Sequence, residues 1–74
     1  MVKLGIIGIG NMGSSHSLNV LGGRTPEIAL AAVADRRESR RDWAREKLPG
    51  VPVFEEGSEL IDSGLCDAVL IAAP

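Results

Sequence analysis

The fold is decided by the stretch Lys3-Leu4-Gly5-Ile6-Ile7-Gly8-Ile9-Gly10-Asn11-Met12-Gly13, an apolar run that leads directly into a G-x-G-x-x-G turn. A second apolar run, 28–34, ends at Asp35, 22 residues beyond Gly13. A glycine-rich turn alone has many causes, and one of them is a turn that binds nothing. The same turn placed after a strand, with an acidic residue at this distance, predicts a dinucleotide site. In such a site the turn holds the pyrophosphate and the acidic residue holds the adenosine ribose.

The three glycines of the turn have separate roles in this interpretation. Gly8 permits the tight passage from strand to helix, where a Cβ would be unfavourable. Gly10 lets a pyrophosphate approach the backbone, and Gly13 lets the following helix pack closely on the strand. A P-loop is excluded, because Ser14 and Ser15 follow Gly13 where that motif needs a lysine.

Main-chain amides and one carboxylate are the predicted cofactor ligands. A helix N-terminus presents unpaired N–H groups and the positive end of its dipole. We therefore expect the N–H groups around Ile9, Asn11 and Met12 to face a pyrophosphate. Asp35 would accept hydrogen bonds from the ribose hydroxyls and repel a 2′-phosphate, which favours NAD and leaves NADP possible. The alternative role of Asp35 is to cap the helix that follows it.

Arginines gather where the second predicted helix begins, although the positive end of a helix dipole is an unfavourable place for cations. They are Arg36, Arg37, Arg40 and Arg41. A nearby anionic ligand would account for them, and Arg36 could stack on an adenine or pair with a 2′-phosphate. The alternative is a solvated surface on which they pair with Glu38 and Asp42.

Strands and helices alternate along the chain, which predicts βαβ units and a parallel sheet. The predicted strands cover residues 3–9, 28–34, 51–54 and 68–73, and the predicted helices cover 12–21, 38–48 and 58–63, the last capped by Ser58. Right-handed crossovers lead to the strand order 3-2-1-4. Continuous apolar runs indicate helices on both faces of the sheet. The predicted fold class is α/β, a Rossmann-like sheet that forms the first half of a doubly wound domain.

The last predicted strand, 68–73, is strongly apolar, yet this order places it at an open edge. Ligands bind outside the carboxyl ends of parallel strands, so we expect Ala72, Ala73 and Pro74 to lie beside the cofactor. A core of this size rarely supplies more than about 3–5 kcal/mol of stability. We therefore expect residues 1–74 to be an incomplete dinucleotide-binding domain: a fragment, a truncation or a chain that needs a partner.

Composition narrows the partners and the compartment. A net charge of −2 and a pI near 5.2 argue against a nucleic-acid partner. No segment approaches the roughly 20 uninterrupted apolar residues of a membrane span, and no signal-peptide cleavage site follows the first apolar run. The single cysteine, Cys66, allows no internal disulfide, which predicts a reducing cytoplasm.

Three side chains that often carry chemistry receive structural roles. We expect Cys66 to be a small buried residue. His16 is expected in the core or at an interface, with a place beneath the glycine turn as the alternative. Trp43 is expected to pack with the residues that share its helical face, Ala44, Lys47 and Leu48.

Three segments together resemble the glucose–fructose oxidoreductase, inositol dehydrogenase and rhizopine-catabolism family. They are 8–16 (GIGNMGSSH), 32–36 (AVADR) and 67–74 (DAVLIAAP). The resemblance runs along the whole chain but covers only the first part of a typical member. It implies an NAD- or NADP-dependent oxidoreductase that acts on a sugar, a polyol or a related hydroxyl compound and assembles as a homo-oligomer.

The resemblance assigns no catalytic residue to this chain. Members of the family use a lysine in a Glu-Lys-Pro motif for proton transfer, whereas Glu46-Lys47 is followed here by Leu48. The alternative function is a non-catalytic dinucleotide-binding sensor or regulator built on the same turn. A flavin-binding turn is more distant, because such sites usually end the second strand with Glu rather than Asp.

Overall fold

One parallel sheet organises the molecule, and the computed structural model describes residues 2–23 and 27–72 of the chain. Its strands are β1 (Val2–Ile7), β2 (Ile28–Ala34), β3 (Val53–Phe54) and β4 (Ala68–Ile71). They pair in the order β3-β2-β1-β4, and every pair is parallel. The predicted order 3-2-1-4 is therefore confirmed.

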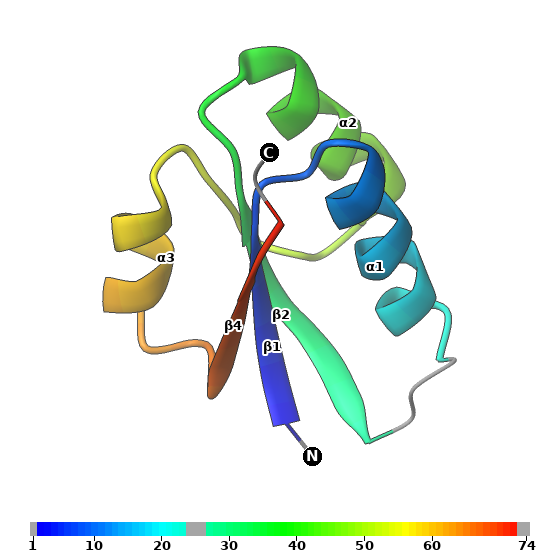
Figure 1. Ribbon diagram of the computed structural model, residues 1–74, viewed down its shortest axis with the longest axis vertical. Helices are drawn as coiled ribbons and strands as arrows, with labels where there is room; N and C mark the ends of the chain where they lie inside the picture. Colours follow the sequence, from blue (N-terminus) through cyan, green and yellow to red (C-terminus); the bar gives the residue numbers. More distant parts are fainter. Residues whose placement is uncertain (1, 24–26, 73–74) are drawn as a thin grey trace.

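Helices cover both faces of this sheet, as its apolar strands predicted. They are α1 (Asn11–Leu21), α2 (Glu38–Lys47) and α3 (Gly57–Asp62). Figure 1 shows α1 and α2 together on one side of the sheet and α3 alone on the other. Helices on both faces of a parallel sheet are the doubly wound arrangement, so the predicted α/β class is also confirmed.

Alternate strand residues supply two separate cores, because successive side chains of a strand point to opposite faces. On the side of α1 and α2 the fully buried residues are Ile6, Ile9, Val33, Ala44 and Leu48. On the side of α3 the fully buried residues are Ala32, Ala34 and Leu60. Trp43 packs against the first core, as expected, whereas Lys47 of the same predicted helical face is exposed.

The α3 face depends on a close approach at Gly5. A Cβ there would lie 2.6 Å from the Cys66 Sγ atom and 2.8 Å from a methyl group of Leu60. Cys66 is therefore a packing residue, although it is half-buried rather than fully buried. Burial raises the pKa of its thiol, and the charge of Asp67 raises it further.

Several predicted boundaries need correction. The first strand ends at Ile7 rather than Ile9, because Gly8 turns the chain with a φ of +93°. Ser58 does not cap α3; Glu56 does, in a reciprocal capping box with Glu59. A carboxylate at this position accepts the N–H of the third helical residue, a bond that Ser58 is one residue too late to make.

The edge strand β4 is exposed along its whole length, as its place in the predicted order implied. Ile71 keeps 70% of its surface in contact with solvent, and Val69 and Leu70 are also exposed. Strand β4 was predicted to reach residue 73, but it ends at Ile71; residues 73 and 74 lie outside the described part of the chain. Within that described part, no helix is both long and apolar enough to cross a membrane.

Candidate functional site

The glycine turn joins β1 to α1 at the carboxyl end of the sheet. The N–H group of Gly8 donates to the Ala34 carbonyl oxygen at 2.8 Å, which ties the turn to the end of β2. Gly10 is the N-cap of α1, and no side chain of a described residue caps it. Residues 11–13, the rest of the motif, form the first turn of α1. The backbone N–H groups that begin α1 are therefore left for another acceptor.

Asp35 links this turn to the end of β2 and to the start of α2. One carboxylate oxygen, Oδ2, accepts the Ile9 N–H at 2.9 Å, and the other, Oδ1, accepts the Arg37 N–H at 2.8 Å. The Arg37 guanidinium also binds both oxygens, at 3.1 Å from Nε and 2.9 Å from Nη2. Asp35 is only 7% exposed, so its charge is stabilised by four hydrogen bonds rather than by water.

These bonds determine the protonation of Asp35. Burial alone would raise the pKa of the carboxyl group, but hydrogen bonds from Arg37 and from the Ile9 N–H outweigh it and lower the pKa to about 2. Asp35 is consequently an anion at neutral pH. Its alternative role as the cap of α2 is wrong, because the N-cap is Arg37.

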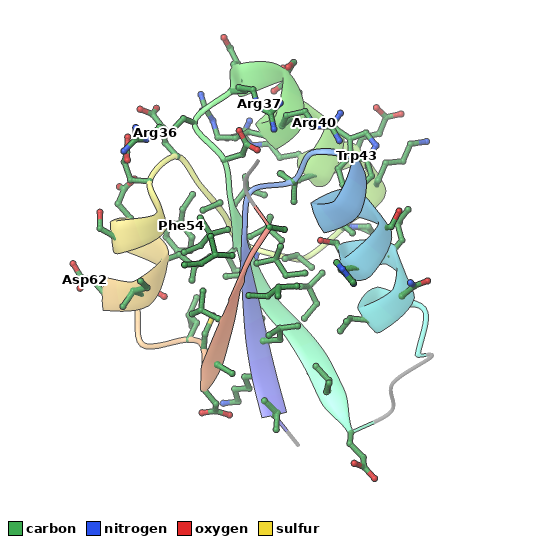
Figure 2. All side chains as sticks on the ribbon, viewed as in Figure 1. Arg36, Arg37, Arg40, Trp43, Phe54 and Asp62 are labelled. Carbon is green, nitrogen blue, oxygen red and sulfur yellow. The ribbon has the colours of Figure 1, made fainter. Side chains whose placement is uncertain are left out.

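The arginines at the start of α2 bind the ends of the strands. Arg40 donates from Nε to the Ile9 carbonyl oxygen at 2.6 Å, and its guanidinium lies 5.3 Å from the centre of the Trp43 ring. Arg41 donates to the carbonyl oxygens of Asp35 and Arg36, at 3.1 and 2.7 Å. Figure 2 shows Arg36, Arg37 and Arg40 gathered at this end of the sheet. Arg40 and Arg41 thus bind backbone carbonyl oxygens, whereas Arg37 binds the Asp35 carboxylate.

The alternative given for these arginines, pairing with Glu38 and Asp42 on a solvated surface, is wrong. Among the described residues, the ion pair of Asp42 is with Arg45, one turn further along α2. Arg36 pairs instead with Glu56 at 3.0 Å, and Arg41 lies 3.7 Å from Glu55. The arginines reach across to the β3–α3 connection, because β3 lies beside β2 and ends at the same edge of the sheet.

An open pocket of about 690 Å³ lies between the end of β2 and the β3–α3 connection. Its polar lining includes Asp35, Arg36, Arg37, Glu55 and Glu56, and its apolar lining includes Ile7, Ala34 and Ile61. Gly8 also lines it, so the first glycine of the turn and Asp35 lie in one pocket. The carboxyl ends of neighbouring parallel strands form such clefts.

The pocket and the turn fit a nucleotide. Among the described residues, a Cβ built at Gly10 would contact only the Arg37 Nη2 atom within 4 Å, at 3.5 Å, which leaves room there for a close-approaching ligand. Apolar walls suit a base, Asp35 suits a ribose, and the uncapped start of α1 suits a phosphate. Among the described residues, no group of three His, Cys, Asp or Glu side chains could hold a metal ion.

The structure describes the other predicted cofactor-binding residues only in part. Ile9 is fully buried and its N–H is bonded to Asp35 in this structure, whereas Asn11 and Met12 begin α1. Ala72 is half-buried and packs on the core at the end of β4. Ala73 and Pro74 lie outside the described residues. Phosphate and nicotinamide contacts at these positions therefore stay predictions.

His16 and the β3–α3 connection depart from what the sequence suggested. His16 is exposed on α1, so its expected place in the core is wrong. Glu55, Glu56 and Ser58 line the pocket although no motif marks them. The available signal was their position directly after β3, since residues that follow parallel strands gather at the ligand edge.

Comparison with known proteins agrees with this geometry. A family model described as an oxidoreductase family with an NAD-binding Rossmann fold matches residues 2–74. An inositol 2-dehydrogenase of Rubrobacter xylanophilus is 41% identical over 73 residues, which are 99% of this chain and 20% of that protein. The chain thus spans about a fifth of the length of the curated relatives it matches.

Solved structures show the same arrangement of elements. The scyllo-inositol dehydrogenase of Lactobacillus casei, with bound NAD(H) and scyllo-inositol, superposes with a TM-score of 0.87 at 30% identity and covers 100% of this chain and 22% of its own. A probable dehydrogenase from Thermotoga maritima gives a TM-score of 0.88 at 32% identity, over 99% of this chain and 21% of its own.

Proposed function

The chain belongs to the Gfo/Idh/MocA oxidoreductase family with an NAD-binding Rossmann fold, and from this premise we propose that it is the cofactor-binding part of a polyol dehydrogenase. The reaction would transfer hydride between a nicotinamide cofactor and a hydroxyl-bearing carbon. The observation that carries the proposal is the buried, anionic Asp35, tied to the glycine turn at 2.9 Å and lining the pocket beside it.

Asp35 and the glycine turn would bind the two ends of the ADP moiety. An ionised carboxylate offers about four acceptor sites, and four N–H donors occupy those of Asp35 in this structure. The two ribose hydroxyls would therefore replace the two guanidinium donors of Arg37, while the backbone N–H groups of Ile9 and Arg37 keep their bonds. The N–H groups at Asn11 and Met12 would receive the pyrophosphate at the uncapped start of α1. Gly8, Gly10 and Gly13 would keep this approach clear of side chains.

Arg36 would lie against the adenine. It lines the pocket, and the planar face of a guanidinium can stack on a base. Ala72, Ala73 and Pro74 would border the nicotinamide ribose, because β4 ends on the other side of β1 from Asp35.

NAD is the proposed cofactor and inositol-like polyols are the proposed substrates. Asp35 supports NAD, since its negative charge disfavours the 2′-phosphate of NADP. The relatives named as inositol dehydrogenases support the substrate class. The nicotinamide, when bound, supplies the hydride acceptor; the residues of this chain bind and orient the nucleotide, and none is assigned to proton transfer.

The experiment is a dehydrogenase assay on the purified protein. Myo-inositol, scyllo-inositol and a sugar control are each offered with NAD or NADP, and reduced nicotinamide is followed by its absorbance. Turnover of an inositol with NAD is expected only where residues 1–74 are joined to a substrate-binding domain, because none of them is assigned to proton transfer; residues 1–74 alone should bind NADH without turnover. In such a longer protein, tight NADH binding without turnover of any polyol would instead favour a dinucleotide-binding sensor.

Location and assembly complete the proposal. A reducing cytoplasm suits a chain whose single cysteine is a packing residue with a raised thiol pKa. A homo-oligomer follows from the family resemblance, and light scattering on the purified protein tests it.

A further inference from the structure

We propose that Glu56 sets the preference for NAD over NADP by holding Arg36 away from a 2′-phosphate. This inference rests on the proposed function, because it concerns the ribose end of the same pocket. Glu56 follows β3 and no cofactor motif includes it. It is a positioning residue, since it would act through Arg36.

The Arg36–Glu56 ion pair spans the pocket. Arg36 follows β2 and Glu56 precedes α3, and both line the cavity into which Asp35 faces. The Arg36 Nε atom donates to the Glu56 Oε2 atom at 3.0 Å. The pair joins two connections that leave neighbouring strands, so it forms part of the pocket wall.

Glu56 is the fixed member of this pair. Its side chain accepts the N–H group of Glu59, and its own N–H group donates to the Glu59 Oε1 atom at 3.0 Å. The Glu56 side chain is 39% exposed, whereas that of Arg36 is 82% exposed. The capping box therefore holds the carboxylate in place, and the flexible arginine comes to it.

The second arginine of the pocket is also neutralised. Arg37 binds both oxygens of Asp35, at 3.1 and 2.9 Å. Among the described lining residues, each arginine thus has a carboxylate partner, and Glu55 pairs with Arg41 at 3.7 Å. A phosphate monoester carries close to two negative charges near neutral pH. It would have to displace Glu56 to gain Arg36, whereas a neutral ribose hydroxyl would not.

Glu56→Gln tests this inference with little risk to the fold. Glutamine still offers an oxygen to the Glu59 N–H group, so α3 keeps its cap. The charge that holds Arg36 is removed, and the guanidinium becomes available to a 2′-phosphate. Glu59→Gln is the matched control, because it changes the other member of the capping box at a residue outside the pocket lining.

The measurement is calorimetric titration of the purified protein with NADH and with NADPH at low salt. In Glu56→Gln the affinity for NADPH relative to NADH should rise about two- to fivefold, the upper part of the range of an exposed charge pair. Affinity for NADH should change less than the ratio does, and Glu59→Gln should resemble the wild type. In the double variant Arg36→Gln/Glu56→Gln the gain should disappear, because no cation remains to be released.

The outcomes separate the two proposals. If the wild type binds NADH but Glu56→Gln leaves the ratio unchanged, this inference is overturned and the proposed function stands. A gain that persists in the double variant also overturns it, since Glu56 would then act without Arg36. If the wild type binds neither nucleotide, the proposed function fails and this inference fails with it.

Discussion

Asp35 and Asp67 are two aspartates that accept a main-chain N–H group from the segment containing β1, at opposite ends of the sheet. Asp35 receives the Ile9 N–H at 2.9 Å at the carboxyl end, and Asp67 receives the Lys3 N–H at 3.1 Å at the amino end. Asp35 is 7% exposed and is bound by Arg37, whereas Asp67 is exposed. The same bond therefore belongs to a pocket in one case and to a solvated strand start in the other.

The difference between Asp35 and Asp67 indicates what makes a carboxylate part of a binding site in this fold. Strand polarity decides it first, because the turns that follow parallel strands gather at one edge and form a crevice there. Burial then decides the strength of each bond, since a buried charge depends on its partners and an exposed one depends on water. Asp35 meets both conditions, and Asp67 meets neither.

The largest effect is expected from Asp35→Ala compared with Asp67→Ala. Removing Asp35 leaves the Ile9 N–H group and Arg37 without their acceptor, which should lower the free energy of unfolding by about 3 kcal/mol. Removing Asp67 should cost about 0.5 kcal/mol, because water replaces the lost bond. Urea denaturation of both variants measures this difference. Equal losses of stability in the two variants would contradict the distinction between Asp35 and Asp67.

The free energy of unfolding should also depend on pH through Asp35, by about 2 kcal/mol. The pKa of Asp35 is about 2 in the folded protein and near 3.9 when unfolded, so the group stabilises the fold above about pH 4. That contribution is lost as the pH falls toward 2. Denaturation curves at several acidic pH values should show a shallower loss in Asp35→Asn than in the wild type. Parallel curves would contradict the assigned partners of Asp35.

Substitutions at two glycines, Gly5 and Gly10, are expected to have smaller effects on stability. Gly5→Ala would push a methyl group into Cys66 and Leu60 and should cost about 1–3 kcal/mol of stability. Among the described residues, a methyl group at Gly10 would meet only the end of Arg37, so Gly10→Ala should cost about 0.5 kcal/mol as a poorer N-cap. Thermal denaturation and NADH titration together test the pair. NADH affinity should fall more in Gly10→Ala, and the reverse order would overturn the assignment of the turn.

The strand order and the meeting of the turn with Asp35 could be predicted, because both depend on local patterns. Apolar runs identify the strands, and the right-handed crossover rule leaves one order for them. The spacing between Gly13 and Asp35 reflects one helix and one strand of ordinary length. Because β1 and β2 are parallel neighbours, the turn after β1 and Asp35 after β2 lie at the same end of the sheet.

The partners of the charged side chains could not be predicted in the same way. Arg36 could meet Glu38 or Glu56, and only the distance between the β2–α2 and β3–α3 connections decides between them. Arg40 binds the Ile9 carbonyl oxygen, a backbone acceptor that no residue type reveals. The cap of α3 was misassigned because Ser58 is a favoured cap type, while the Glu56–Glu59 pair satisfies more of the backbone.

The NADH affinities of Asp35→Asn and Asp67→Asn show whether Asp35 makes the ribose site. Both substitutions keep the shape of the side chain and remove one charge. Asp35→Asn should bind NADH about 10- to 100-fold more weakly than the wild type, because ribose hydroxyls lose a charged acceptor. Asp67→Asn should bind NADH as the wild type does. Unchanged binding in Asp35→Asn, or equal loss in the two variants, would contradict the claim that Asp35 makes the ribose site.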